Sequence, residues 1–273
     1  MAAVFFHQIQ EKPGPYTVSL KEFRETLDSL QRAGYVFIAL DQFLAFVEGR
    51  GDVPPGAVLL AADDGYEGIY SLAFPALKAR RIPLVVFPIT KWLAPVRREE
   101  LHLPKVSPEQ LRLMAASGLV AVGSHTHEGH STVGGQPYYQ ARLHSPWTGR
   151  PETGDERRAR IWNDLVVSRA VLEEIVGRPP SALSLPFGCT GREVREAARR
   201  AGFRCIFAGR EGLVDRKTDL MDLPRVRWER GPLLKQLKNL GHQPGLPRYK
   251  KEKRQKQAEG YFPQSSFASF IHG

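Results

Sequence analysis

The sequence predicts an α/β protein in which parallel β-strands close into a barrel surrounded by helices. Short apolar runs that suit buried strands alternate with amphipathic stretches that suit helices along most of the 273 residues. About seven strand–helix units can be counted, which favours a barrel over a short open sheet. Polar residues directly follow several of the apolar runs, and in such barrels the chemistry lies at these carboxyl ends of the strands.

The first half of the chain shows this alternation clearly. Its predicted strands are short apolar runs at residues 4–6, 35–39, 58–62 and 84–87. Between them, apolar residues spaced three and four apart predict helices at residues 20–33, 41–47 and 69–79. In the first helix Phe23, Leu27 and Leu30 share one face, which we expect to pack on the sheet.

The second half repeats the pattern around a long loop. Helices are predicted at residues 108–117 and 156–176, and Pro108 suits the first turn of the former. Strands are predicted at residues 119–122, 182–185, 204–207 and 226–228. Residues 131–155 are rich in Gly and Pro, and this predicts a long loop that could form a lid or a wall of a substrate site.

The composition is that of an ordinary globular protein, with 42% apolar residues. No apolar run approaches the roughly 18 residues of a membrane-spanning helix, and the N-terminus lacks a signal-peptide pattern. Cys189 and Cys205 form neither a metal-binding pair nor a disulfide framework. We therefore expect no transmembrane segment and a cytoplasmic location, or a periplasmic or extracellular one if a removed segment precedes the sequence as given.

The net charge of +10 is concentrated near the C-terminus, where residues 233–273 hold eight Lys and Arg against two Glu. We divide the chain into a folded domain over residues 1–234 and a basic tail over residues 235–273, which we expect to be solvated and disordered. Such a tail could contact an anionic polymer or membrane. Charge alone is weak support for a partner, so no nucleic acid is expected, and the oligomeric state is left open.

Two adjacent carboxylates, Asp63 and Asp64, follow the apolar run of residues 57–62. Neighbouring residues of a strand point to different sides, so one carboxylate can bind a metal while the other faces a bound water. Gly65 lets the chain turn sharply just after them. Asp-Asp-Gly is also common turn chemistry. The apolar strand before it, together with the histidines farther along the chain, favours a functional site.

Three histidines, His125, His127 and His130, directly follow the strand predicted at residues 119–122. Two imidazoles and one carboxylate make an open site typical of catalytic zinc, although cobalt, nickel and iron also accept these donors. His125 and His130 are the favoured pair because Gly129 lets the loop bend between them, and His127 with His130 is the alternative. The sequence thus predicts one divalent metal, with zinc as the first choice.

Two further positions extend this hypothesis. His7 ends the first predicted strand and is a candidate general acid. Arg225 could pair with Asp63 and lower the pKa of its carboxyl, although taken alone this arginine is better interpreted as a surface charge. Residues 184–188, with the sequence Ser-Leu-Pro-Phe-Gly, could line a groove.

These motifs resemble those of the NodB-type polysaccharide deacetylases, carbohydrate esterase family 4. The first, second, third and a later arginine motif of the family are matched by residues 63–66, 124–130, 184–188 and 223–226. Residues 5–9 and 16–23 are similar to the poly-β-1,6-N-acetylglucosamine deacetylase branch, in which the catalytic histidine lies near the N-terminus. The resemblance covers residues 3–230.

The resemblance implies a distorted (β/α)7 barrel, the NodB-like deacetylase fold. It also implies a hydrolase that removes N-acetyl groups from N-acetylglucosamine-containing polysaccharide, releasing acetate and leaving a free amine on the sugar. Carried over by position, it implies Asp64, His125 and His130 as the ligands of the metal. The partner would be a glycan substrate.

The resemblance also assigns the proton-transfer groups. It implies Asp63 as general base, Arg225 as the residue that orients it, and His7 as general acid. The residues that would contact the glycan are Tyr66, Pro186 and Phe187.

Two departures from the family pattern leave room for a changed substrate. Ala61 and Ala62 stand where Thr-Phe is usual, and Leu185 stands where an aromatic residue or arginine is usual. Two other functions therefore compete with the first. One is deacylation of a small or lipid-linked amino sugar, and the other is a non-catalytic glycan-binding barrel.

Overall fold

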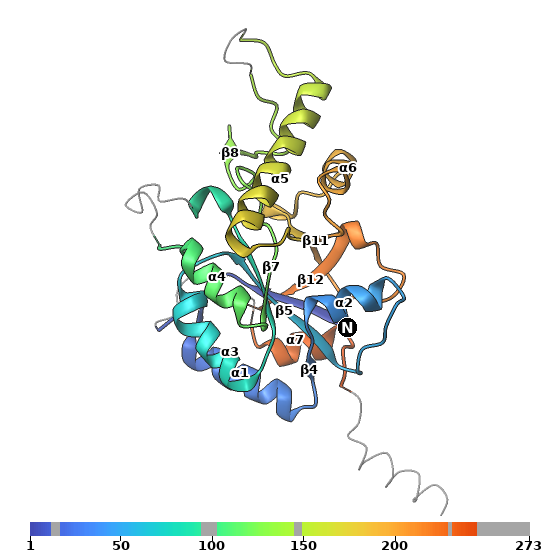
Figure 1. The fold of residues 1–273 in the computed structure, drawn as a ribbon. Coiled ribbons are helices and arrows are strands. Elements are labelled where there is room, and N and C mark those ends of the chain that lie inside the picture. Colours follow the sequence, from blue (N-terminus) through green and yellow to red (C-terminus); the bar gives the residue numbers. More distant parts are fainter. Residues whose placement is uncertain (12–16, 94–102, 145–148, 229–230, 245–273) are drawn as a thin grey trace, which may run out of the picture.

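In the computed structural model of this chain the described residues are 1–11, 17–93, 103–144, 149–228 and 231–244. Parallel strands form one sheet that curls into a nearly closed barrel, which confirms the predicted fold class (Figure 1). Along the sheet the order is β10 (Ala182–Ser184), β11 (Cys205–Glu211), β12 (Leu223–Arg227), β1 (Ala2–Phe6), β5 (Ala57–Asp64), β6 (Leu84–Pro88) and β7 (Val120–Val122). β4 (Val36–Phe37) pairs with the start of β5, outside this path.

The barrel closes where the chain leaves β7. Ser124 and Leu183 form a single parallel bridge. The N–H of Ser124 donates to the carbonyl of Ala182 at 3.0 Å, and the N–H of Ser184 donates to the carbonyl of Ser124 at 2.9 Å. Because this seam consists of a short bridge instead of a full strand pair, the barrel is distorted, as the family resemblance implied.

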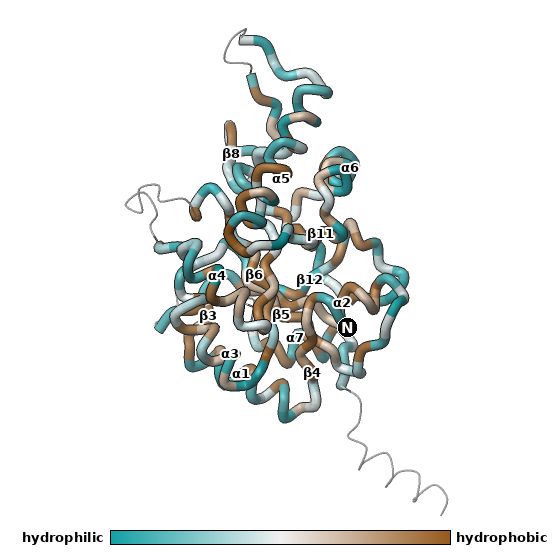
Figure 2. Tube along the Cα trace, in the orientation of Figure 1, coloured by the Kyte–Doolittle hydropathy of each residue, from teal (hydrophilic) through white to brown (hydrophobic). Residues whose placement is uncertain are grey.

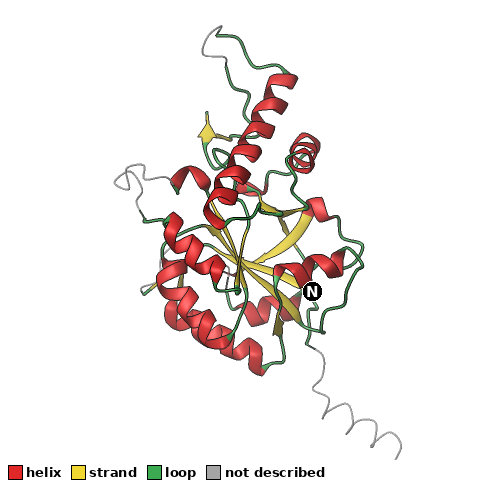
Figure 3. Ribbon diagram, viewed as in Figure 1, coloured by secondary structure: helices red, strands yellow, loops and turns green. Residues whose placement is uncertain are grey.

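Helices cover the outside of the barrel (Figure 3). One group shares a core with alternate residues of β1 and β5 and consists of α1 (Leu20–Arg32), α3 (Phe74–Arg80), α4 (Pro108–Ala116) and α7 (Leu233–Asn239). A second group packs on β10 and β11 and consists of α5 (Gly154–Val176) and α6 (Arg192–Arg200). Figure 2 shows apolar residues concentrated in the central strands and hydrophilic ones on α6 and the far end of α5.

Strand alternation decides which side chains enter the barrel. Ala3 and Phe5 of β1, and Leu59 and Ala61 of β5, belong to one buried cluster with side chains of four other strands, so this cluster fills the inside. α2 (Leu40–Val47) packs against the same cluster through Phe43. Successive residues of a strand point to opposite faces. The next inward position after Phe5 is therefore His7, and the next after Ala61 is Asp63. Both are polar and line the cavity described below.

The short elements were not all predicted. Residues 35–39 were expected to be a strand, but only β4 pairs, because α2 begins at Leu40. The 131–155 loop contains the hairpin of β8 (Thr132–Val133) and β9 (Gln136–Pro137). Two further strands, β2 (Gln8–Gln10) and β3 (Thr17–Ser19), pair in parallel beside the barrel. Single turns of helix occur at η1 (Ile69–Ala73), η2 (Thr90–Trp92), η4 (Pro186–Gly188) and η5 (Leu220–Asp222).

The domain boundary expected between residues 234 and 235 falls inside α7, so that expectation needs correction. Leu237 is fully buried. The hydroxyl of Tyr35 donates to the carbonyl of His242 at 2.7 Å, and the His242 imidazole donates from Nε2 to the carbonyl of Ala57 at 3.0 Å. These contacts attach the chain to the barrel as far as His242. The rest of the expected basic tail, residues 245–273, lies outside the described residues.

Within the described ranges, every helix is too short or too polar to cross a membrane.

The docking of α7 gives a direct test of the extended domain. Leu237→Ala should lower the free energy of unfolding by about 2–4 kcal/mol, because it leaves a cavity under α7. Lys238→Ala, an exposed position one residue later, should change it by less than about 0.5 kcal/mol. Urea unfolding followed by circular dichroism measures both. Small and equal effects would mean that α7 does not belong to the folded domain.

Candidate metal centre and catalytic site

A cavity of 690 Å³ opens at the carboxyl ends of the barrel strands. Eight of the positions singled out in the sequence line it: His7, Asp63, Asp64, Tyr66, His125, His130, Phe187 and Arg225. Pro186 is buried and does not line this cavity, whereas its neighbour Leu185 does. Residues far apart in the chain therefore meet in one place, as strand-end positions of a parallel barrel should.

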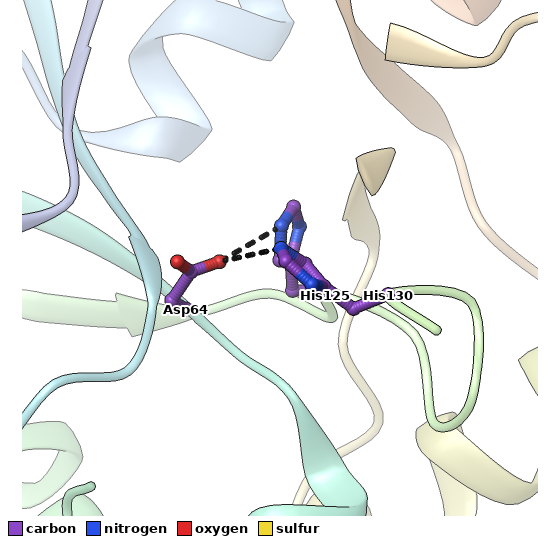
Figure 4. Close-up of side chains that lie close together, drawn as sticks. All are labelled: Asp64, His125 and His130. Atoms are coloured by element: carbon purple, nitrogen blue, oxygen red, sulfur yellow. Dashed lines mark ion pairs between the residues drawn. The ribbon is translucent and has the colours of Figure 1, made fainter. Parts of the chain in front are cut away.

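Three of these side chains form a compact set of metal donors. Oδ1 of Asp64 lies 3.2 Å from Nε2 of His125 and 3.4 Å from Nε2 of His130. Figure 4 shows both imidazole rings directed at this carboxylate oxygen. All three donor atoms lie within 4.8 Å of one another. Oδ1 of Asp64 is buried and accepts no hydrogen bond of good geometry. A divalent cation between these donors would satisfy that oxygen, so the residues fit a metal ion.

The tautomer of His125 suits metal binding. Its Nδ1 lies 2.8 Å from the carbonyl oxygen of Ser184. A carbonyl can only accept, so Nδ1 carries the proton and Nε2 presents its lone pair to the donor set. His125 is buried, while the side chain of His130 is 28% exposed. The set is therefore closed on the barrel side and open toward the cavity, which is typical of a catalytic site.

The loop that carries His130 is held from two sides. Oδ1 of Asp164 on α5 accepts the N–H of Glu128 at 2.5 Å, and Oδ2 accepts the N–H of His127 at 3.3 Å. The imidazole Nδ1 of His127 lies 2.9 Å from Oγ1 of Thr90. The ring of His127 therefore contacts Thr90. The donor set contains His125 and His130, the pair that the sequence favoured. Asp164 was not predicted from the sequence, although an acidic residue on the buried face of a helix indicates a specific polar contact.

Asp63 lies in a different environment from Asp64. Nη1 of Arg225 contacts both of its oxygens, at 3.0 and 2.8 Å, and the hydroxyl of Ser184 donates to Oδ2 at 3.1 Å. Arg225 is buried, so its interpretation as a surface charge was wrong, and the pairing with Asp63 is present. Burial raises the pKa of Asp63, but Arg225 and two nearby histidines outweigh burial and hold that pKa below its usual value.

Backbone strain is concentrated at the cavity. Among described residues other than glycine, φ is positive at Asp64 (67°), Thr126 (72°), Phe187 (56°) and Arg81. The first three lie on three of the segments that build the site, and such conformations persist only where the surroundings impose them. The left-handed backbone at Asp64 breaks strand alternation. Both carboxylates therefore line the same cavity instead of pointing to the two sides expected of a regular strand.

Aromatic rings form the walls of the cavity. Phe187 is 54% exposed, and its ring centroid lies 5.1 Å from that of His130. His7 packs edge-on against Phe5 at a centroid distance of 5.6 Å. Burial, and then the charge of Asp64, raises the pKa of Tyr66 to about 12, so this wall remains a neutral phenol. The cavity thus offers apolar faces around a charged floor, an arrangement that suits a sugar ring.

Comparison with known proteins places this geometry in context. A family model described as polysaccharide deacetylase matches residues 50–206. The chain is 26% identical over 251 residues to the poly-beta-1,6-N-acetyl-D-glucosamine N-deacetylase of Escherichia coli K12, covering 86% of this chain and 37% of that protein. It is 26% identical over 211 residues to the protein of the same name from Staphylococcus epidermidis, covering 77% and 68% of the two chains. The chain thus spans little more than a third of the Escherichia coli relative.

Solved structures share the fold across most of the chain. A de-N-acetylase from Aggregatibacter actinomycetemcomitans superimposes with a TM-score of 0.75 at 25% identity, covering 86% of this chain and 98% of that one. The BpsB deacetylase domain from Bordetella bronchiseptica superimposes with a TM-score of 0.72 at 26% identity, covering 83% and 94%.

The donor set predicts how single substitutions change metal content. His125→Ala and His130→Ala should each weaken binding of a divalent ion well over tenfold, since loss of outer-shell partners alone costs roughly 10–100-fold. His127→Ala is the matched control and should retain the ion, because its ring contacts Thr90. Elemental analysis after dialysis against zinc measures all three. Metal loss in His127→Ala with retention in His125→Ala would reverse the assignment and favour His127 with His130.

Proposed function

The chain belongs to the polysaccharide deacetylase family, and on that premise we propose that it is a metal-dependent hydrolase that removes N-acetyl groups from poly-β-1,6-N-acetylglucosamine-like polysaccharide. Membership confirms the family predicted from the motifs. The observation that carries the proposal is a second carboxylate, Asp63, buried beside the donor set of Asp64, His125 and His130 in one cavity. A metal site with an adjacent base is one arrangement that can hydrolyse an unactivated amide.

The donor set would hold one divalent ion. Asp64, His125 and His130 supply one carboxylate and two neutral imidazoles, a combination found in catalytic zinc sites. We propose zinc, and the same donors would accept cobalt, nickel or iron. When bound, the ion supplies Lewis acidity at this position.

Asp63 is placed to act as general base. Its carboxylate remains ionised because Arg225 and the hydroxyl of Ser184 stabilise the charged form. A carboxylate has about four lone-pair sites, so these contacts leave room for a proton from an attacking water. Arg225 touches both oxygens of Asp63 and therefore fixes the orientation of the base.

His7 enters the same cavity from the end of β1 and is placed to act as general acid. Water adds its oxygen to the acetyl carbon, the bond from carbon to nitrogen breaks, and the sugar nitrogen needs a proton to leave as an amine. His7 would donate that proton while Asp63 holds the one taken from water. The backbone N–H of Phe187 is a proposed donor to the oxygen of the tetrahedral intermediate.

The exposed face of Phe187 and the ring of Tyr66 offer two surfaces on which a sugar can lie. Leu185 also lines the cavity, at a position where the family more often has an arginine or aromatic residue. We propose that this departure changes contacts with the sugar and not the hydrolytic chemistry, because an apolar leucine side chain can neither bind the metal nor transfer a proton.

The division of labour between the two carboxylates is testable. Asp63→Asn should lose roughly 10²–10⁴-fold in acetate release from β-1,6-linked N-acetylglucosamine oligomers while keeping its metal, because the base is lost and the three metal donors are unchanged. Asp64→Asn should lose the metal itself. Acetate is measured by a coupled assay and metal by elemental analysis. Equal metal loss in both variants would defeat the assignment, and activity on monomer alone would favour the small-sugar deacylase.

The acid role of His7 predicts a dependence on the leaving group. His7→Ala should lower acetate release from the oligomers by about 10²-fold, because the amine cannot leave unprotonated. The ester 4-nitrophenyl acetate has a leaving group that needs no proton, so its hydrolysis should fall far less. His144→Ala, an exposed position outside the cavity lining, serves as control. Equal losses on both substrates would assign the proton donation to another residue.

A further inference from the structure

Lys105 is a buried cation next to the cavity that the proposed reaction does not use. The residue is only 7% exposed, and its ammonium nitrogen has no hydrogen-bond partner among the parts of the chain that the structure describes. Burial lowers the pKa of Lys105 to about 8, and the charge of Asp64 opposes that shift. Burying an ammonium group is costly unless something nearby compensates it. The surroundings of Lys105 therefore show what its charge does.

Two aromatic rings surround this ammonium group. Nζ of Lys105 lies 3.2 Å from the centroid of the Tyr66 ring and 4.6 Å from that of Trp92. An isolated antiparallel bridge between Tyr66 and Lys105 holds their backbones together. A desolvated cation over an aromatic face is attracted to it more strongly than an exposed one. The ammonium group therefore fixes two rings that come from different segments of the chain.

Both rings lie next to metal donors. Tyr66 lines the cavity, and the Asp64 carboxylate is close enough to raise the pKa of its hydroxyl. The Trp92 ring lies 5.8 Å from the His130 ring, centroid to centroid. Lys105 thus contacts two rings, and each ring lies next to one of the three metal donors. The third donor, His125, is held separately by the carbonyl of Ser184.

We propose that Lys105 is a positioning residue of the metal centre, whose ammonium group fixes the Tyr66 and Trp92 rings and through them the placement of Asp64 and His130. The inference rests on the metal site of the proposed function. An apolar side chain of the same length would fill this space without the cost of burying a cation. We therefore infer that the charge of Lys105, and not its bulk alone, is required. Loss of the charge should therefore disturb the donors while sparing the fold.

The experiment compares Lys105→Met with Lys105→Arg, using Co²⁺ as the metal probe. The visible absorption of bound Co²⁺ reports the geometry of its ligands whether or not the protein turns over a substrate. Lys105→Met should change that spectrum and lower kcat/KM on the oligomers about tenfold, in the range typical of lost outer-shell support. The free energy of unfolding of metal-free Lys105→Met should be no lower than that of the metal-free unsubstituted protein. Lys105→Arg keeps the cation and should recover most of the spectrum.

Arg200→Met is the matched control, because this guanidinium lies 5.5 Å from the Trp162 ring on the α5–α6 side and outside the cavity lining. It should leave the Co²⁺ spectrum unchanged. Identical spectra for Lys105→Met and the unsubstituted protein would overturn the proposal, as would equal destabilisation by both Lys105 variants. A protein that binds Co²⁺ but releases no acetate would refute the proposed function alone. Failure to bind Co²⁺ at all would refute both.

Discussion

The buried ion pair between Asp63 and Arg225 is the interaction on which the site depends. The two residues lie 162 positions apart in the chain, and both are almost inaccessible to solvent. Removing one partner would leave an uncompensated charge in the barrel, at a cost of about 3–5 kcal/mol. The pair forms only if β12, β1 and β5 keep their register, with Val4 opposite both Val226 and Leu60. Assembly of the barrel therefore also sets the orientation of Asp63, the proposed base.

Ser184 links that ion pair to the metal donors. Its hydroxyl donates to Asp63, and its carbonyl accepts the Nδ1–H of His125. The same residue lies at the seam where β10 meets Ser124 and closes the barrel. The short seam leaves the carbonyl of Ser184 free of a regular strand partner, so it can fix the histidine tautomer. The distortion of the barrel thus has a direct chemical consequence.

Much of the fold and most of the site could be predicted from the sequence, because strand alternation and strand ends are local patterns. His7, Asp63 and His125 were found at strand ends for that reason. Asp164 left a partial signal as an acid on the buried face of a helix. The contacts of Asp164 and Lys105 could not be predicted, because they depend on which loop packs against which element. The preference for His125 over His127 as the partner of His130 rested on the loop bend that Gly129 permits. Its physical cause, the contact of His127 with Thr90, exists only after the loop folds.

The different roles proposed for the two adjacent carboxylates follow from their neighbours. In a regular strand Asp63 and Asp64 would face opposite sides, and only one could reach the cavity. The positive φ of Asp64 brings both into it, at an energetic cost that the surrounding contacts must offset. Arg225 then occupies both oxygens of Asp63, whereas Oδ1 of Asp64 is left facing two imidazoles. These contacts are consistent with the proposed roles, in which Asp63 acts as the base and Asp64 binds the cation.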